Sequence, residues 1–207
     1  MKRILIIDYG MGNLHSVASA IRKLGYNSKI SSSKKEIKDA SHLILPGVGQ
    51  FTKAMSNLKL SGLDETIIEV SNNKKAKILG ICLGMQILCK SSSEGEVTTK
   101  GLGLINTDVI KLEQDKNYKL PHIGFNEVTF DKNSIFKNSK KILRDFYFVH
   151  SYCLRNFEED KDTVLGYSKY KNEFVSFFQK GLLFATQFHP EKSQSNGLNF
   201  LKLFFEL

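Results

Sequence analysis

The sequence predicts a single α/β domain with a central, largely parallel sheet that is flanked by helices, and with additional antiparallel strands in its second half. Two patterns lead to this prediction. In the first half, short apolar runs alternate with longer segments of helical period, which is typical of βαβ units and of a parallel sheet covered on both faces. In the second half, apolar runs follow one another more closely, which favours strands.

Length and composition agree with one domain over residues 1–207. The chain is 41% hydrophobic and 25% charged, as expected for a protein with one sizeable core. No apolar run approaches the roughly 20 residues of a membrane helix, and the first run stops at Asp8, too early for a secretory signal. The segment Glu113–Lys119 is too short to separate two domains. We therefore expect a cytoplasmic protein in which Cys82, Cys89 and Cys153 are free thiols.

The formal net charge of +9 raises the question of a nucleic-acid partner. Only four of the basic residues are arginines, and the lysines are spread along the chain. Base reading and bidentate phosphate contacts favour arginine, and nucleic-acid-binding proteins cluster their charge. We interpret the lysines as a solvated surface and expect neither a nucleic-acid nor a membrane partner.

The first half supplies three strands and three helices. The expected strands are Arg3–Ile7, His42–Leu45 and Lys77–Ile81. Asn13 would cap the first helix, which stops at Gly25 and has an apolar face made of Leu14, Val17, Ala18, Ile21 and Leu24. A second helical segment is centred on Leu63, Ile67, Ile68 and Val70, and a third follows Cys82.

The second half has more strand character. Its expected strands are Leu104–Ile110, Ile123–Phe130, Phe146–Val149, Thr163–Ser168, Phe174–Gln179 and Leu182–Gln187. Apolar and polar residues alternate poorly from Phe174 to Phe178, so this strand is expected to be buried on both faces. A last helix from about Ser195 would place Leu198, Leu201 and Phe205 on one face.

A G-x-C-x-G motif at residues 80–84 marks the end of one strand and the start of a helix. This is the nucleophile-elbow pattern with sulfur in place of the serine oxygen. The glycines leave room for a sharp turn, and the helix that follows points its N-terminus at Cys82, which favours a thiolate. We interpret Cys82 as a catalytic nucleophile; a buried structural cysteine on a glycine-rich turn is the competing interpretation.

A cysteine nucleophile needs a base, and His189 is the best placed of the five histidines. It follows the strand Leu182–Gln187 and is separated from Glu191 only by Pro190. The proline restricts the backbone, so the carboxylate can orient the imidazole. A Cys82-His189-Glu191 triad is therefore predicted, its members meeting in space rather than along the chain.

The segment Pro46–Gly49 (PGVG) follows the strand His42–Leu45. In elbow enzymes one oxyanion donor is the N–H after the nucleophile, and the second comes from the loop of a neighbouring strand. The expected donors are the N–H of Leu83 and that of Val48 or Gly49.

Six motifs occur in a fixed order along essentially the whole chain: Asp8–Asn13 (DYGMGN), Leu45–Gly49 (LPGVG), Gly80–Gln86 (GICLGMQ), Pro121–Asn126 (PHIGFN), Phe148–Tyr152 (FVHSY) and Gln187–Ser193 (QFHPEKS). Together they resemble the class I (triad) glutamine amidotransferases and, within them, the glutaminase subunits of imidazole glycerol phosphate synthases. The resemblance implies an enzyme that hydrolyses L-glutamine to glutamate and ammonia through a Cys82 thioester. It also implies that the heterodimer partner is a (β/α)8-barrel synthase chain. The ammonia would be used there to make imidazole glycerol phosphate and aminoimidazole carboxamide ribotide in histidine biosynthesis.

The resemblance assigns further residues. Gln86 and Glu94 would hold the amino-acid end of glutamine, and Ser151 and Tyr152 would complete the pocket. The residues expected on the synthase-facing side are Asn13, Phe125 and Lys192. No cofactor and no metal is implied. The role of His150 is left open between a buried structural histidine and a part in the site.

Phe125 departs from the family pattern, which usually has tryptophan there, and the chain contains no tryptophan. This keeps open an alternative, a paralogous glutaminase that feeds a synthase amidating a bacterial surface sugar. A cysteine peptidase or γ-glutamyl hydrolase on the same elbow scaffold is a second enzyme hypothesis. It would act without a partner, whereas the 207 residues leave no room for a synthase domain and so favour a separate synthase chain.

Overall fold

The computed structural model describes residues 2–137, 144–155 and 163–207. Its strands are β1 (Ile4–Ile7), β2 (Ser28–Ser31), β3 (His42–Gly47), β4 (Lys77–Cys82), β5 (Cys89–Ser92), β6 (Thr99–Lys100), β7 (Ile105–Lys111), β8 (His122–Glu127), β9 (Thr129–Phe130), β10 (Asp145–His150), β11 (Tyr152–Leu154), β12 (Thr163–Tyr170), β13 (Asn172–Lys180) and β14 (Leu183–Thr186). Its helices are α1 (Leu14–Lys23), α2 (Lys34–Asp39), α3 (Phe51–Ser61), α4 (Leu63–Asn72), α5 (Leu83–Ile87), the 3₁₀ turn η1 (Pro190–Lys192) and α6 (Gln194–Glu206).

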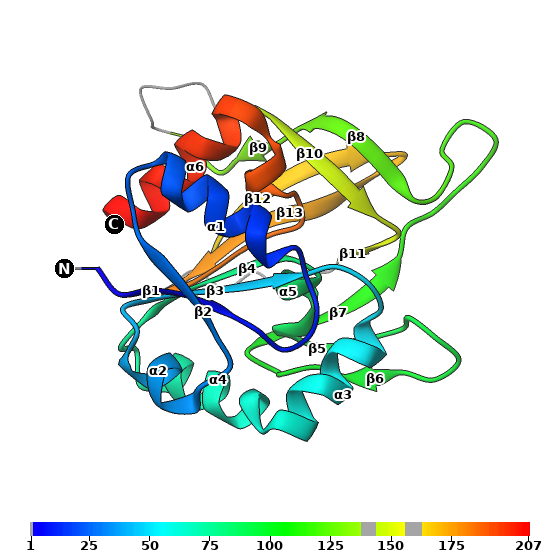
Figure 1. Ribbon diagram of the computed structural model, residues 1–207. Helices are drawn as coiled ribbons and strands as arrows, with labels where there is room; N and C mark the ends of the chain where they lie inside the picture. Colours follow the sequence, from blue (N-terminus) through cyan, green and yellow to red (C-terminus); the bar gives the residue numbers. More distant parts are fainter. Residues whose placement is uncertain (1, 138–143, 156–162) are drawn as a thin grey trace.

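A large mixed sheet organises the molecule (Figure 1). Strands β2, β1, β3, β4 and β14 lie side by side in that order and are parallel. The sheet continues through antiparallel β13, β11 and β7, and β12 pairs with β13 and β9. Strand β14, from the end of the chain, lies between β4 and β13, so both halves of the chain share one sheet. This confirms the predicted sheet with its antiparallel addition.

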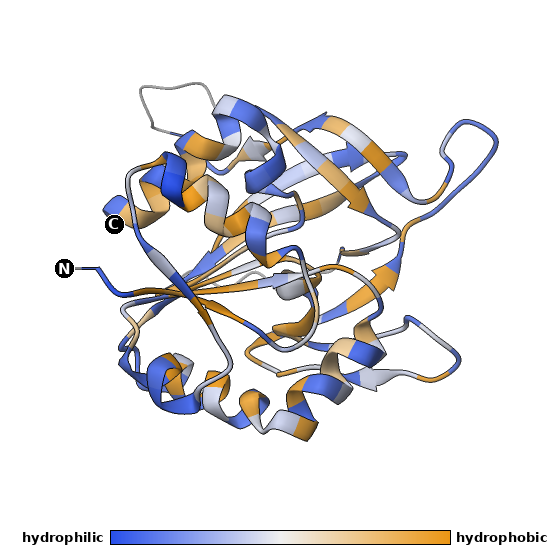
Figure 2. Ribbon diagram, in the orientation of Figure 1, coloured by the Kyte–Doolittle hydropathy of each residue, from blue (hydrophilic) through white to orange (hydrophobic). Residues whose placement is uncertain are grey.

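Helices cover both faces of the parallel part. Figure 1 shows α1 and α6 on one side of the sheet and α2, α3 and α4 on the other. Figure 2 shows the apolar residues concentrated in the strands and on the helix faces turned toward them. The layer under α1 and α6 is rich in aromatic rings; Phe146 and Phe188 stack with their ring centres 4.0 Å apart, and Phe136 and Phe200 at 4.4 Å. These rings belong to the same buried cluster as Cys82.

Two local predictions are confirmed, the Asn13 cap and the buried run from Phe174 to Phe178. Asn13 caps α1, accepting a hydrogen bond from the backbone N–H of Ser16 at 3.3 Å. The residues from Phe174 to Phe178 are all buried, as expected for a strand covered on both faces. No helix in residues 2–137, 144–155 and 163–207 is long and apolar enough to cross a membrane.

One strand boundary was wrong. The run Ile123–Phe130 was expected as one strand, but it forms β8, which pairs with β10 in a separate two-stranded sheet, and β9, which pairs with β12. The break comes at Val128, whose N–H donates to the Arg144 carbonyl at 2.7 Å and whose side chain is buried. The split moves Ile123 and Phe125 onto a ribbon that stands apart from the main sheet.

Candidate active site

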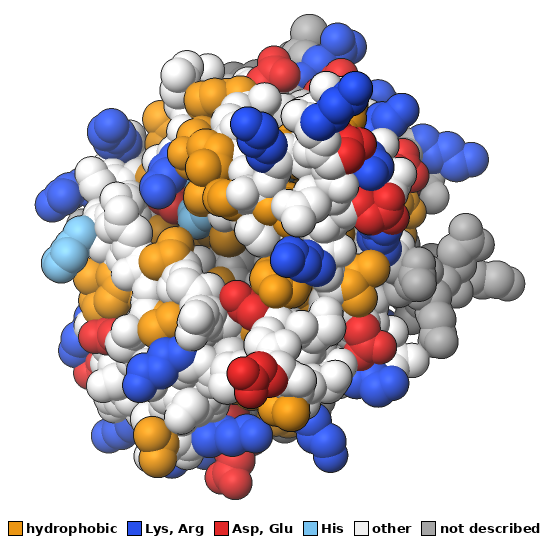
Figure 3. Space-filling model, turned by 90° about the vertical axis from the view of Figure 1, so that its right-hand side faces the viewer, with side chains coloured by type: hydrophobic (Ala, Val, Ile, Leu, Met, Phe, Trp, Pro, Cys, Tyr) orange, Lys and Arg blue, Asp and Glu red, His pale blue; other side chains and the backbone are white. Residues whose placement is uncertain are grey.

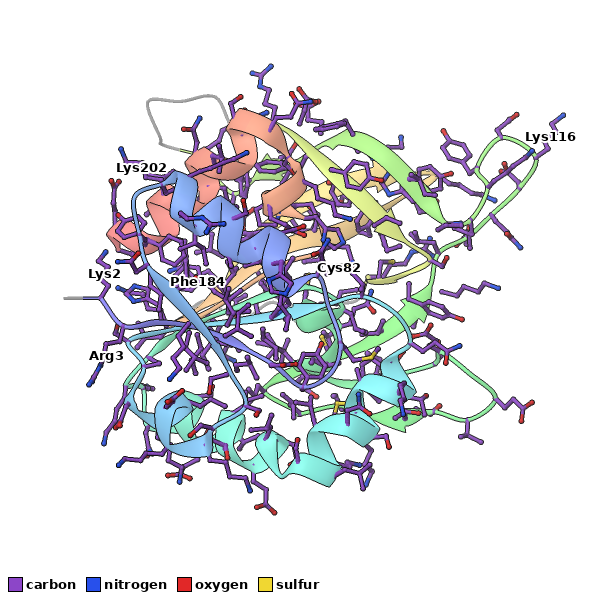
Figure 4. The ribbon with its side chains drawn as sticks, viewed as in Figure 1. Lys2, Arg3, Cys82, Lys116, Phe184 and Lys202 are labelled. Atoms are coloured by element: carbon purple, nitrogen blue, oxygen red, sulfur yellow. The ribbon has the colours of Figure 1, made fainter. Side chains whose placement is uncertain are left out.

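Cys82 lies where the C-terminal ends of three neighbouring parallel strands meet. It ends β4, where it is aligned with Gly47 of β3, and β14 lies on the other side of β4. Figure 4 labels it close to the centre of the molecule, where β4 passes into α5. The backbone of Cys82 has φ +55° and ψ −107°, a strained conformation for a residue with a side chain and one that clusters at functional sites.

The glycines around Cys82 permit this turn by close approach of backbone atoms. A Cβ on Gly84 would overlap the carbonyl oxygen of Leu45, and one on Gly80 would lie 2.8 Å from the carbonyl oxygen of Gly84. The start of α5 is therefore pressed against the end of β3. This explains the spacing of the motif in steric terms.

His189 and Glu191 form a buried pair at the end of β14. Nδ1 of His189 is 2.7 Å from Oε1 of Glu191, and the two side chains are 2% and 3% exposed. The backbone is fixed as well, because the N–H of His189 donates to the Tyr147 carbonyl at 2.9 Å and the Ser193 hydroxyl donates to the His189 carbonyl at 2.6 Å. The imidazole is therefore held by its ring and by its main chain.

The charge of this pair depends on Cys82. Burial disfavours the charged imidazole, but the nearby sulfur and the Glu191 carboxylate outweigh it and raise the pKa of His189 well above its ordinary value. Nε2 of His189 has no hydrogen-bond partner within standard limits, although Cys82 is close enough to raise that pKa. The arrangement is that of a histidine whose Nε2 exchanges a proton with a neighbouring nucleophile.

Besides His189, the sulfur of Cys82 has two polar neighbours of opposite kind. Its thiol faces the Val149 carbonyl oxygen at 3.9 Å, and Nε2 of Gln187 donates toward it at 3.6 Å. No role was predicted for Gln187, although it ends the expected strand Leu182–Gln187 and begins the motif that contains His189 and Glu191.

A cavity of about 500 Å³ opens beside the sulfur. Ten of the predicted site residues line it: Asn13, Val48, Gly49, Cys82, Leu83, Gln86, Glu94, Ser151, Tyr152 and Lys192. His189, Glu191 and Phe125 are not among its lining residues. The cavity also borders Pro121, Val149 and His150, which were not predicted to line it.

The loop expected to supply oxyanion donors is anchored at both ends. The Tyr9 hydroxyl donates to the Pro46 carbonyl at 2.8 Å, and the N–H of Phe51, at the start of α3, donates to Oε2 of Glu94 at 2.8 Å. Burial, and then the charge of Cys82, raise the pKa of Tyr9. Between these anchors Val48 is 38% exposed and Gly49 has φ +106°. The middle of the loop thus faces the cavity.

Gln86 and Glu94 line the cavity, and each already makes hydrogen bonds to other residues of the chain. Nε2 of Gln86 donates to the Tyr152 carbonyl at 2.9 Å and to Oε1 of Gln187 at 3.0 Å. Glu94 holds Phe51 through one carboxylate oxygen only. Its second oxygen can meet a positively charged group.

A pair of buried histidines, of which His150 borders the cavity, lies at the cavity wall. Nδ1 of His122 is 3.0 Å from Nε2 of His150, whose own Nδ1 is 2.9 Å from the Tyr152 carbonyl. Burial lowers the pKa of His122 to about 4 and that of His150 to about 3, so both rings are neutral at pH 7. His150 therefore acts in a hydrogen-bond network and not as a charge.

Two of the three residues expected on the synthase-facing side, Phe125 and Lys192, lie against Tyr147, and the third, Asn13, lines the cavity. Phe125 is half exposed and packs edge-on against Tyr147, with ring centres 5.7 Å apart, and Nζ of Lys192 lies 5.8 Å from the centre of the same ring. Ile123 on the same strand is 60% exposed and was not predicted. Figure 3 shows this side of the molecule, with apolar side chains lying among lysines and acidic residues.

A second cavity of about 450 Å³ lies at the other end of the sheet. It is lined by residues near the N-terminal ends of β1 and β2, among them Lys2, Arg3, Glu36 and Asp39, and Figure 4 labels Lys2 and Arg3 far from Cys82. The described residues that line it include no histidine and no cysteine. Its Lys29–Glu36 ion pair is exposed, and we assign no chemistry to it.

Comparison with known proteins shows similarity to glutamine amidotransferases in sequence and in fold. Residues 5–207 match the family model described as glutamine amidotransferase class-I. The imidazole glycerol phosphate synthase subunit HisH 1 of Campylobacter jejuni is 44% identical over 204 residues, which cover 99% of this chain and 100% of that protein. Subunit HisH 2 of Methanococcus maripaludis is 43% identical, with 98% of each chain covered. The crystal structure of a glutamine amidotransferase has a TM-score of 0.72 at 17% identity, covering 96% of each chain, a likeness in fold.

Proposed function

This chain belongs to the class I glutamine amidotransferase family, and from that premise we propose that it is the glutaminase subunit of an imidazole glycerol phosphate synthase, built as one domain over residues 1–207. The observation that carries the proposal is the strained Cys82 at the end of β4 beside the buried His189–Glu191 pair at the end of β14. The names of the relatives support the choice of synthase.

The first half-reaction forms a thioester. Nε2 of His189 takes the thiol proton, and the sulfur attacks the side-chain carbonyl carbon of glutamine. The carbonyl oxygen becomes an oxyanion, which the N–H of Leu83 and the N–H of Val48 or Gly49 stabilise. The imidazolium then gives its proton to the departing nitrogen, which leaves as ammonia while the γ-glutamyl group stays on Cys82.

The second half-reaction releases glutamate. His189 takes a proton from water, the hydroxide attacks the thioester carbonyl, and the Cys82 sulfur leaves and regains a proton. Glu191 keeps Nδ1 of His189 protonated through the 2.7 Å contact, so Nε2 is the nitrogen that exchanges protons. The free oxygen of Glu94 binds the α-ammonium group of the substrate, and Gln86, Ser151 and Tyr152 line the rest of its amino-acid end.

The ammonia passes to a (β/α)8-barrel synthase chain in a heterodimer. Ammonia that reaches water is protonated and loses its nucleophilicity, so a partner has to cover the cavity mouth. The exposed Phe125, together with Lys192 and Asn13, lies on that side of the chain. Neither a cofactor nor a metal enters this mechanism.

A second candidate is a paralogous glutaminase whose partner amidates a surface sugar. The observation in its favour is Phe125, which offers an apolar ring but lacks the indole N–H of the tryptophan usual in the family. The glutaminase chemistry is the same in both candidates. Reconstitution with each type of synthase distinguishes them.

Replacement of Cys82 tests the proposal. In the reconstituted complex, Cys82→Ala should abolish glutamine-dependent synthesis and leave synthesis driven by added ammonium intact. Cys89→Ala, which removes a buried thiol that donates to the Met85 carbonyl at 3.5 Å, is the matched control and should retain both activities. Glutamine-dependent synthesis by Cys82→Ala would overturn the assignment.

A further inference from the structure

Gln187 lies beside the nucleophile because of strand register. In the parallel pair of β14 and β4, Thr186 is aligned with Ile81, so the next residue along each strand, Gln187 and Cys82, are also neighbours. The Gln187 side chain is fully buried, and its backbone N–H donates to the Ser176 carbonyl at 2.9 Å. Its amide is therefore held at a fixed place next to the sulfur.

The orientation of the Gln187 amide follows from its neighbours. A backbone carbonyl only accepts hydrogen bonds, so the group of Gln86 that lies 2.9 Å from the Tyr152 carbonyl is its NH₂. The second hydrogen of that NH₂ goes to Gln187 at 3.0 Å, and the atom of Gln187 that receives it must be the oxygen. The NH₂ of Gln187 is then the group that faces Cys82 at 3.6 Å.

The Val149 carbonyl can interact with the protonated thiol of Cys82, and the Gln187 amide N–H can interact with the thiolate. The Val149 carbonyl can accept from the S–H at 3.9 Å, but it offers nothing to the sulfur once the proton has left. A thiolate needs donors, and the Gln187 N–H is already in place without rearrangement. A donor fixed in a buried site stabilises negative charge more than one in water does.

We infer that Gln187 is a further catalytic residue, whose side-chain N–H stabilises the Cys82 thiolate both before attack and when the thiolate leaves the thioester. The inference rests on the proposed role of Cys82 as the nucleophile. Gln86 takes part as a positioning residue, because its NH₂ fixes which end of the Gln187 amide meets the sulfur.

Two substitutions separate this role from simple packing. Gln187→Glu keeps the shape and can still accept from Gln86, but it replaces the fixed NH₂ donor with a carboxyl oxygen, which repels a thiolate when the carboxyl is ionised. Gln187→Met fills similar space without polar groups. The control is Ser176→Ala, which removes a buried hydroxyl from the strand next to β14; this hydroxyl donates to the Gly166 carbonyl and accepts from the Ser168 hydroxyl, away from the sulfur.

The readout is the pH profile of Cys82 alkylation by iodoacetamide, measured on the isolated folded chain without glutamine or partner. His189 and Tyr9 are the titratable groups whose charges couple to the sulfur, and all variants keep both. A hydrogen bond to a charged group accounts for at least about one pH unit, so Gln187→Met should move the midpoint upward by that amount and Gln187→Glu further. Ser176→Ala should leave it in place.

Midpoints within 0.3 pH unit (roughly a twofold change in thiolate population) of the wild type in both Gln187 variants would overturn the inference. So would shifts that match the one in Ser176→Ala. Because the assay contains no glutamine, a wrong reaction assignment would leave these results unchanged, and only the Cys82→Ala synthesis assay would reveal it. In the complex, both Gln187 variants should lower kcat more than they raise KM for glutamine, whereas a packing defect that only widens the pocket would raise KM.

Discussion

At the scale of single residues, the basicity of His189 depends on a carboxylate that never meets the substrate. Glu191 holds Nδ1 at 2.7 Å in a site where both side chains are almost completely buried. Removing the charge while keeping the shape leaves the ring without its ionic partner and allows the wrong tautomer. The contact between residues 189 and 191 would be kept, but the protonation equilibrium of His189 would change.

We therefore predict that Glu191→Gln lowers kcat for glutamine hydrolysis on the order of 10²–10⁴-fold. The pKa of His189 should fall because one of the groups that raise it is lost. Steady-state kinetics in the complex, with and without added ammonium, check this. An ammonium-dependent activity that falls by the same factor would point to damage at the partner interface, and an unchanged kcat would remove Glu191 from the mechanism.

At the scale of elements, the site is built by close contact between the start of α5 and the end of β3. Gly84 has no space for a methyl group because the Leu45 carbonyl oxygen occupies it. A Cβ added at Gly181 would meet nothing within 4 Å, but the φ of this residue is +58°. Substitution of Gly84 therefore tests the effect of steric overlap, and substitution of Gly181 tests the effect of backbone strain alone.

Gly84→Ala should lower the free energy of unfolding by at least about 3 kcal/mol, because a backbone segment must shift. Gly181→Ala should lower it by only about 1–2 kcal/mol, the cost of a left-handed backbone for alanine. Urea unfolding of both variants measures the difference. Equal losses in the free energy of unfolding would mean that the contact between α5 and β3 adjusts to the added methyl group at no extra cost in stability.

The elements that sequence could predict are those whose pattern is local. The strand before Cys82 and the strand before His189 are short apolar runs that stop at marked turns, so their ends, and the residues there, could be predicted. Strand β2 has the sequence SKIS with no fully buried position, and α2 buries only Ile37. Neither carries enough apolar periodicity to be recognised, and both depend on packing against β1 and α4.

The polar network around the sulfur could not be predicted for a different reason. The contact of Gln187 with Cys82 depends on the register of β14 against β4, and the His122–His150 pair depends on the register of β8 against β10. Register between strands distant in the chain is a tertiary property. The motifs contain Gln187 and His122, but their residue types and spacing predict no role for either, and the role of His150 was left open.

At the scale of the whole molecule, three buried histidines make stability depend on pH. Burial lowers the pKa of His122 and His150, and burial with the nearby lysines 77 and 2 lowers that of His42 to about 4. A histidine in the unfolded chain has a pKa of about 6.5. Between that value and 4, the unfolded chain binds protons that the folded chain does not, so folding is disfavoured as the pH falls.

The free energy of unfolding should therefore fall below pH 6.5 by about 1.4 kcal/mol per pH unit for each of these histidines. Urea unfolding between pH 7 and pH 5 measures the slope. His150→Gln should reduce the slope by one histidine's share, and His15→Gln, at an exposed position of α1, should not change it. A slope in His150→Gln equal to that of the wild type would contradict the assigned protonation states.

The oxyanion loop links the site to the proposed partner. Tyr9 and Glu94 anchor its ends, while its middle faces the cavity, so the peptide at Gly47–Gly49 can reorient when a partner covers it. We predict that the isolated chain hydrolyses glutamine slowly and that synthase plus acceptor raises kcat. Misplacement of one oxyanion donor in the isolated chain is expected to lower kcat by a factor on the order of 10²–10³. Equal turnover with and without the partner would contradict the switch and leave the triad untouched.

The central claim is that glutamine is cleaved through a covalent bond to Cys82, and the most direct measurement is to trap that bond. The complex is mixed with glutamine, quenched in acid during turnover, digested and analysed by mass spectrometry. The account predicts a γ-glutamyl group on the peptide that contains Cys82, none on the peptides that contain Cys89 or Cys153, and none in Cys82→Ala. Steady ammonia release while Cys82 is never modified, or a glutamyl group on another residue, would contradict it.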